Sequence, residues 1–278
     1  MIKTRRRFAG ILSYVTAFFP SLVEAERLRA SINAFSLARL FWLDRQLPPA
    51  NRLVRCDESA TVCLNLQQPA EKLWEDISKN GRHEIRSMMR AGERVRIVAN
   101  TPEVRRDFLV LYNAFARAKA DIRPISRHVL ARYGAYADVT VAYLDDLPMC
   151  THVHLRDASI GRARLIYSAG RRLEEPKLAQ LCGKLNRMLH WHSIMAYRDR
   201  GFSIYDFGGI SRDPNNGIAR FKQSFGGDVV REFTYWCAGS SLTKAALRGY
   251  FALRNAKDSA SSDAADPATI DSEAHDAV

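Results

Sequence analysis

The chain has 278 residues, of which 47% are hydrophobic, and it carries a net charge of +12. This length allows one large domain or two small ones, and the surplus of Lys and Arg suits either an anionic partner or a solvated basic surface. The five cysteines form no C-x-x-C pair, which argues against a zinc ribbon or disulfide framework and favours a reducing, cytoplasmic compartment.

The first twenty residues predict an N-terminal helix. Basic residues at 3–7 precede a mostly apolar stretch at 8–19, and Pro20 ends it. The stretch is too short and too polar to span a bilayer. It is typical of the first helix of a fold, of a secretory signal, or of a helix that makes peripheral membrane contact through residues 1–20. No other segment is apolar enough to cross a membrane.

Residues 22–43 repeat apolar side chains at helical spacing and predict an amphipathic helix, so we expect residues 1–50 to form an N-terminal helical segment. Pro48 and Pro49 end that segment. The next elements are expected to be a strand at 61–66, a helix at 69–77, a turn at 79–81, a helix at 82–90 and a strand at 94–99.

From residue 101 the pattern predicts a sheet with helices on its faces. Helices are expected at 102–119, 127–133, 176–198, 217–224 and 243–255, and strands at 139–144, 149–156, 163–168, 202–207 and 229–236. In the last segment, 256–278, Lys257 stands against six acidic residues and there is little to bury. We expect this segment to be a disordered acidic tail.

The most distinctive segment runs from Tyr205 to Ile210, Tyr-Asp-Phe-Gly-Gly-Ile. It predicts a strand that ends in an acidic residue and a Gly-Gly turn. A short helix carrying Lys222 follows, and Gly226 and Gly227 lead into the next strand. Paired glycines allow the backbone to approach a ligand closely, so this segment indicates a binding or catalytic site.

Three segments resemble the Fem aminoacyltransferases, which build peptidoglycan cross-bridges and belong to the GNAT superfamily. They are residues 73–92, 189–201 and 205–227, and the third is the most specific. The resemblance implies an α/β (α+β) GNAT acyltransferase fold, with a mixed central sheet flanked by helices. Residues 101–255 would form the acyltransferase domain. Fem proteins usually contain two such domains, and here only a partial first GNAT-like lobe, residues 51–100, would precede it.

The resemblance implies transfer of an acyl or aminoacyl group to an amino group of a cell-envelope precursor. The acyl donor would be aminoacyl-tRNA or acyl-CoA, and no further cofactor is implied. The Q/R-x-x-G-x-G/A loop that holds coenzyme A in many GNAT enzymes is missing after Tyr167, where residues 168–172 read Ser-Ala-Gly-Arg-Arg. Two alternatives stay open: an acyl-CoA-dependent N- or O-acyltransferase acting on a saccharide or small molecule, and a non-catalytic RNA- or membrane-binding protein.

Acyl transfer requires two substrates held together, a proton acceptor, and stabilisation of the oxyanion. The resemblance implies that Lys222, beside Phe221 in a Phe-Lys motif, places a cation near the acyl donor, although a surface lysine fits the residues alone. Asp206 is a candidate to accept the amine proton, or to cap its own turn. Gly208 and Gly209 would bring the backbone close to the substrate.

Further candidates come from charge and spacing. Arg82 and Arg86 share one helix face and could bind a phosphorylated acceptor, or form a solvated face. His152 and His154 alternate on a strand and point the same way, so one of them is a candidate base. No carboxylate or cysteine pattern completes a metal site with them, and we expect none. The remaining candidates for substrate contact are Tyr167, Arg171 and Tyr205.

Overall fold

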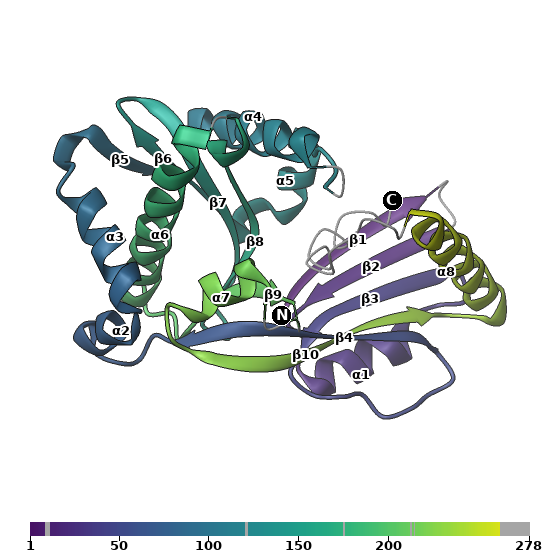
Figure 1. The fold of residues 1–278 in the computed structure, drawn as a ribbon. Coiled ribbons are helices and arrows are strands. Elements are labelled where there is room, and N and C mark those ends of the chain that lie inside the picture. Colours follow the sequence, from purple (N-terminus) through teal and green to yellow (C-terminus); the bar gives the residue numbers. More distant parts are fainter. Residues whose placement is uncertain (9–11, 120–121, 175, 212, 214, 262–278) are drawn as a thin grey trace. The chain divides into compact units, whose positions relative to one another are not determined.

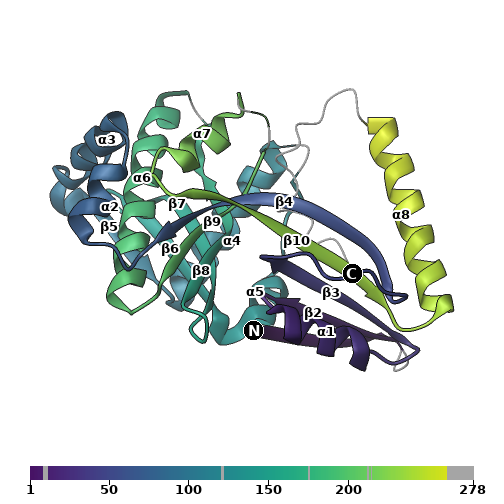
Figure 2. The ribbon, with the colours of Figure 1, turned by 90° about the horizontal axis from the view of Figure 1, so that it is seen from below.

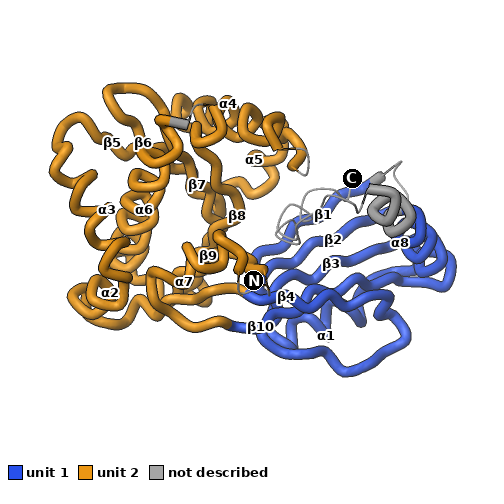
Figure 3. The backbone as a smooth tube through the Cα atoms, in the orientation of Figure 1, with its two compact units in different colours: residues 1–60, 230–267 blue, residues 61–229, 268–278 orange. Residues whose placement is uncertain are grey.

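The computed structural model describes residues 1–8, 12–119, 122–174, 176–211, 213 and 215–261. The chain forms two compact units, which Figure 3 shows in different colours: of the described residues, unit 1 contains those in 1–60 and 230–261, and unit 2 contains those in 61–229. Strands β4 (Leu53–Asn65) and β10 (Asp228–Ala238) pass from one unit into the other. Unit 1 is therefore built from both ends of the chain.

Unit 1 contains a sheet with the strand order β1-β2-β3-β10-β4. Its remaining elements are β1 (Ile2–Phe8), β2 (Leu12–Phe18), α1 (Leu22–Ser31), β3 (Ser36–Leu43) and α8 (Ser241–Ser261). β2 and β3 are parallel, whereas β1 pairs with β2 and β10 with β3 in antiparallel fashion. Ser21 and Glu24 form a capping box that starts α1, and Leu28 of this helix packs into a core with Leu40.

The expectation of an N-terminal helix is wrong, because residues 2–8 and 12–18 form an antiparallel hairpin. Lys3, Arg5 and Arg7 lie on the exposed side of the edge strand β1, two residues apart, as strand residues on one face do. In the sequence, the basic run hides this alternation and fits helical spacing equally well. The single helix expected at 22–43 is also wrong. It ends at Ser31, and the nearly continuous apolar run of β3 is buried, as in a strand covered on both faces.

At the other end of the chain, α8 continues to Ser261, so the first residues of the expected disordered tail are helical. The rest of that tail, residues 262–278, lies outside the described residues. Within the described part of the chain, none of the helices combines the length and apolar character needed to cross a membrane.

Unit 2 contains a sheet with the strand order β4-β9-β8-β7-β6-β5. Its elements are α2 (Ala70–Asp76), α3 (Lys79–Met89), β5 (Val95–Ala99), α4 (Pro102–Ala118), α5 (Arg127–Tyr133), β6 (Ala137–Leu144), β7 (Leu147–Asp157), β8 (Arg162–Gly170), α6 (Pro176–Asp199), β9 (Ile204–Ile210) and α7 (Gly217–Gln223), with 3-10 turns at Gly92–Arg94, Gly134–Tyr136 and Arg171–Leu173. They follow the sequence prediction closely from residue 61 onward, with two exceptions. The expected turn at 79–81 is the first turn of α3, and the expected turn at Gly208 and Gly209 is wrong, because both glycines lie within β9.

The sheet of unit 2 carries α4 on one side and α6 on the other (Figures 1 and 2). The strands from β5 to β8 are antiparallel, and β8 and β9 are parallel. The register between β8 and β9 runs only from the Arg162–Ile204 pair to the Arg164–Asp206 pair, although both strands continue beyond it. The two strands therefore share a short paired base at the start of β9.

The second Gly-Gly pair has a packing role. Gly226 and Gly227 adopt φ angles of +81° and +90°, which L-residues with a side chain rarely adopt. A Cβ atom at Gly227 would lie 2.6 Å from the carbonyl oxygen of Cys63. Gly227 therefore lets the turn between α7 and β10 pack directly against the backbone of β4, and Gly226 lets it pack against Asp76 at the end of α2.

Candidate active site

Strand β9 presents its first polar residues to opposite faces of the sheet. Tyr205 faces α6 and Asp206 faces the other side, as successive strand residues do. Both side chains are completely buried. Each is surrounded by a separate polar cluster, and the two clusters differ in charge.

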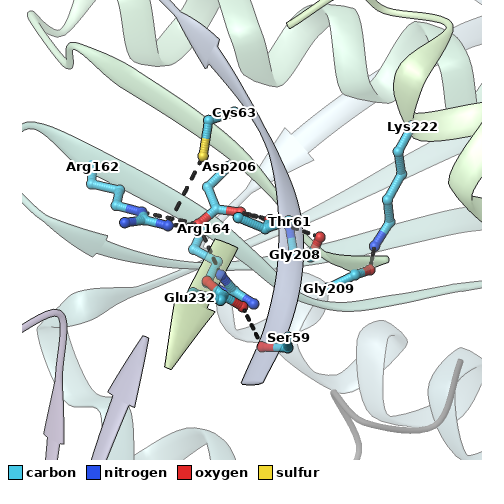
Figure 4. Close-up of polar contacts among 10 residues, drawn as sticks. All are labelled: Ser59, Thr61, Cys63, Arg162, Arg164, Asp206, Gly208, Gly209, Lys222 and Glu232. Carbon is cyan, nitrogen blue, oxygen red and sulfur yellow. Dashed lines mark hydrogen bonds and ion pairs between the residues drawn. The ribbon is translucent and has the colours of Figure 1, made fainter. Parts of the chain in front are cut away.

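Asp206 lies at the centre of an ion-pair cluster (Figure 4). Its Oδ2 atom accepts hydrogen bonds from Arg162 Nε at 2.9 Å and from Arg164 Nη1 at 3.0 Å. Its Oδ1 atom accepts from the hydroxyl of Thr61 on β4 and from the backbone N–H of Gly208, the latter at 2.9 Å. The carboxylate thus joins three strands at the end of the paired part of β8 and β9.

Burial alone would raise the pKa of the Asp206 carboxyl, but the charges of Arg164 and Arg162 outweigh burial and hold the pKa well below its ordinary value. Both carboxylate oxygens are occupied by donors. A strongly stabilised, fully bonded carboxylate is a weak proton acceptor at neutral pH. The hydrogen bond to Gly208 is the one that the turn-capping interpretation requires.

Lys222 lies on α7, whose N-terminus is capped by the Asn216 side chain. Its Nζ atom donates to the carbonyl oxygen of Gly209 at 2.5 Å. Gly208 has a φ angle of +75°, and its carbonyl oxygen accepts from Thr61 Oγ1 at 2.8 Å. The structure therefore brings Asp206 and Lys222 to the same Gly-Gly segment of β9, where each contacts the backbone and not the other side chain.

The second cluster is formed by Tyr205 and three histidines. Tyr205 Oη lies 2.9 Å from His154 Nε2 and 2.9 Å from His190 Nδ1. His152 packs its ring 4.2 Å from that of His190, and its Nε2 atom donates to Asn186 Oδ1 at 2.8 Å. All four aromatic side chains are at most 2% exposed.

Desolvation lowers the pKa of His152 to about 4 and the pKa values of His154 and His190 well below the ordinary value, and it raises the pKa of Tyr205. The cluster is therefore uncharged at neutral pH. His152 Nδ1 is buried and has no hydrogen-bond partner in the described structure. In the part of the chain that the structure describes, no group of three or more His, Cys, Asp or Glu residues is placed to hold a metal ion.

Phe221 also lies against the histidine cluster, with its ring 5.5 Å from that of His190 and the Arg187 guanidinium 4.5 Å above it. Arg187 is held by Glu84 of α3 at 2.5 Å. The aromatic member of the Phe-Lys motif thus packs toward α6, while Lys222 reaches the backbone of β9 at Gly209.

Four of the expected site residues lie apart from both clusters. Arg82 donates to the carbonyl oxygens of Glu75 and Ile77 at the end of α2, and the exposed Arg86 lies over the Trp74 ring. Arg171 donates to the Pro148 carbonyl and pairs with Glu174. Tyr167 is buried against Phe108 and Tyr112 of α4. Their contacts are those of structural residues.

Sequence reasoning missed Thr61, Arg162, Arg164 and His190. Two arginines two residues apart in an otherwise apolar strand point to the same face and indicate a buried counterion. Nothing local identifies that counterion as Asp206, which follows more than forty residues later. Thr61 carries no recognisable signal, because a threonine in a strand is ordinary.

The comparisons with known proteins agree with this fold. The FemAB family model matches residues 184–235, from α6 through β9 and α7 into β10. FemX has a similar structure, with a TM-score of 0.59 at 8% identity over 84% of this chain and 83% of FemX. L-PGS from Bacillus licheniformis follows with a TM-score of 0.53 at 12% identity, covering 84% and 80% of the two chains.

A third similar structure is the C-terminal domain of a protein from Agrobacterium fabrum that is assigned as a lysylphosphatidylglycerol synthetase. It has a TM-score of 0.52 at 11% identity and covers 86% of this chain and 82% of that domain. No curated protein matches the sequence. The expected mixed α/β acyltransferase fold is confirmed, and the family match supports the predicted Fem-type, GNAT-like acyltransferase.

Proposed function

We propose that this protein transfers an acyl or aminoacyl group to an amino group of a cell-envelope precursor. The observation that carries the proposal is the position of the FemAB match. It covers residues 184–235, which hold the Gly208–Gly209 segment of β9 and Lys222. Lys222 is fixed at that segment through the Gly209 carbonyl.

The reaction begins when the amine nitrogen of the acceptor attacks the carbonyl carbon of an ester or thioester donor. The carbonyl oxygen gains negative charge, the alcohol or thiol of the donor leaves, and the nitrogen loses a proton. An ammonium placed beside the reacting carbonyl stabilises both the oxyanion and the departing group. We assign this role to Lys222, with the Gly208–Gly209 backbone lining the approach.

The same likeness supports the choice of donor. A lysylphosphatidylglycerol synthetase, by its name, joins a lysyl group to phosphatidylglycerol, so this fold accommodates aminoacyl transfer to an envelope component in that protein. We therefore favour aminoacyl-tRNA as the donor, with acyl-CoA as the alternative. The described cysteines are all free thiols, in keeping with a protein that works in the cytoplasm.

The test combines donor and acceptor screens with one variant. Purified protein is incubated with labelled aminoacyl-tRNAs or acyl-CoAs and with envelope precursors that carry a free amine, and products are identified by mass spectrometry. Lys222→Ala should lower kcat by about 100-fold or more, since one oxyanion donor contributes about that much. The melting temperature should hardly change, because this half-buried side chain contributes little packing.

Lys222→Arg keeps the positive charge and serves as the matched control, with an intermediate rate. Full activity of Lys222→Ala would remove this lysine from the mechanism. Turnover with acyl-CoA but with no aminoacyl-tRNA would support the alternative donor. Salt-dependent binding of RNA or liposomes without any turnover would favour a non-catalytic protein.

A further inference from the structure

Gly208 and Gly209, near the end of β9, are each held by a side chain from a different element. The carbonyl oxygen of Gly208 accepts from Thr61 Oγ1 at 2.8 Å, and its N–H donates to Asp206 Oδ1 at 2.9 Å. The carbonyl oxygen of Gly209 accepts from Lys222 Nζ at 2.5 Å. Because glycine has no side chain, a Gly-Gly segment rotates easily unless its peptide groups are fixed by such contacts.

The Thr61 hydroxyl lies between two acceptors, Asp206 Oδ1 and the Gly208 carbonyl oxygen (Figure 4). Its single hydrogen is shared between them. Thr61 therefore links the carboxylate to the peptide group that joins Gly208 to Gly209. Thr61 stands on β4, outside residues 184–235, so neither the family match nor the Gly-Gly motif points to it.

Arg162 and Arg164 fix the carboxylate from the opposite side. Their guanidinium groups bond to Asp206 Oδ2, which leaves Oδ1 for Thr61 and Gly208. Arg164 is also the residue that pairs with Asp206 in the last described register position between β8 and β9. The side chains of Arg164, Asp206 and Thr61 are completely buried, so the cluster forms a rigid base for the Gly208–Gly209 segment of β9.

We propose that Thr61 and Asp206 are positioning residues, which hold the Gly208–Gly209 backbone so that the Gly209 carbonyl places the Lys222 ammonium for acyl transfer. The inference rests on the role proposed above for Lys222. Asp206 then acts through the backbone and not as a proton acceptor. A displacement of the ammonium by about 1 Å costs on the order of 100-fold in rate, so the cluster matters to catalysis without touching substrate.

The test compares Thr61→Val with Thr61→Ser. Valine has nearly the same shape but no hydroxyl, whereas serine keeps the hydroxyl and loses only the methyl group. The first readout needs no substrate: trace acetylation by N-hydroxysuccinimidyl acetate, with the labelling rate of Lys222 measured by mass spectrometry against that of exposed Lys72 in the same molecule. We expect Lys222 to be labelled about fivefold faster in Thr61→Val, which corresponds to the loss of about one hydrogen bond. Thr61→Ser should be labelled at the wild-type rate.

The second readout is turnover of the donor and acceptor found in the screen. Thr61→Val should lower kcat about 10- to 100-fold with KM within about twofold, and Thr61→Ser should stay within about threefold of wild type. The double variant Thr61→Val/Lys222→Ala should be no slower than Lys222→Ala, because the hydroxyl acts through the lysine. If Thr61 were a purely structural residue, Thr61→Val would lower kcat by the same factor in the wild type and in Lys222→Ala.

A lower melting temperature of Thr61→Val with unchanged labelling and unchanged kcat overturns the proposal. Should Thr61→Val fail to fold, Thr61→Ala carries the same expectations, since it removes the hydroxyl without adding volume. Failure of the proposed function has a different signature: Lys222→Ala would stay active while the labelling difference between Thr61→Val and Thr61→Ser persists.

Discussion

Tyr205 and Asp206 are neighbours on one strand and are equally buried, but their polar partners differ in charge. On one face, two arginines surround a carboxylate that stays ionised. On the other, a phenol lies between two neutral imidazoles, and burial keeps a third imidazole, that of His152, neutral as well. The comparison shows two ways to bury polar groups beside a candidate active site: opposite charges that require each other, and neutral groups that need only hydrogen bonds.

The charged cluster should show the largest effect. Asp206→Ala removes the carboxylate that bonds to the buried Arg164 and the partly buried Arg162, and removal of one partner from such a cluster costs about 3–5 kcal/mol. Urea unfolding measures the loss directly. Asp206→Asn is the matched control of shape, and it should also be strongly destabilised because the charge is what pairs with Arg162 and Arg164. A loss below about 1 kcal/mol for Asp206→Ala would contradict this description of the cluster.

The neutral cluster should instead reveal itself in mild acid. The pKa of His152 is about 4 in the folded protein and about 6.5 when unfolded, so the unfolded chain binds the proton first as pH falls. The resulting stability is fully present above pH 6.5 and is lost between pH 6.5 and 4, by about 3 kcal/mol for this residue alone. The pKa of Asp206 is lowered, so its contribution is lost only below the ordinary value of 3.8.

Unfolding free energies from pH 7 to pH 4 therefore separate the two clusters. His152→Gln can still donate to Asn186 but does not titrate in this range, so its stability should fall less steeply than that of the wild type. The charges of Asp138, Asp206 and Arg200 also affect the pKa of the neighbouring His154. The wild type and His152→Gln share these three residues, so the comparison between them isolates His152. Equal slopes for the wild type and His152→Gln would show that His152 is not buried as a neutral imidazole.

The comparison also explains what could be predicted from the sequence. The helices and strands from residue 61 onward follow local periodicity, and the Gly-Gly motif pointed to the place where Lys222 bonds, although the two glycines continue β9 and form no turn. The N-terminal hairpin was missed because residues 1–20 give a short apolar run without clear alternation. Neither cluster could be assembled in advance. Arg164 and Asp206 are brought together by strand register, and His152 and His190 by the packing of α6 on β7, which are tertiary facts.

The smallest effect should come from the neutral cluster at neutral pH. Tyr205→Phe keeps the ring that packs against Phe207 and removes only the hydroxyl between His154 and His190. The imidazoles lose one buried partner but leave no unpaired charge, so we expect about 1–3 kcal/mol, less than for Asp206→Ala. Tyr143→Phe is the control, because its hydroxyl bonds to Asp107 where the carboxylate is only partly buried. A loss for Tyr205→Phe that equals the loss for Asp206→Ala would mean that the tyrosine carries a buried charge after all, and the distinction between the two faces of β9 would fail.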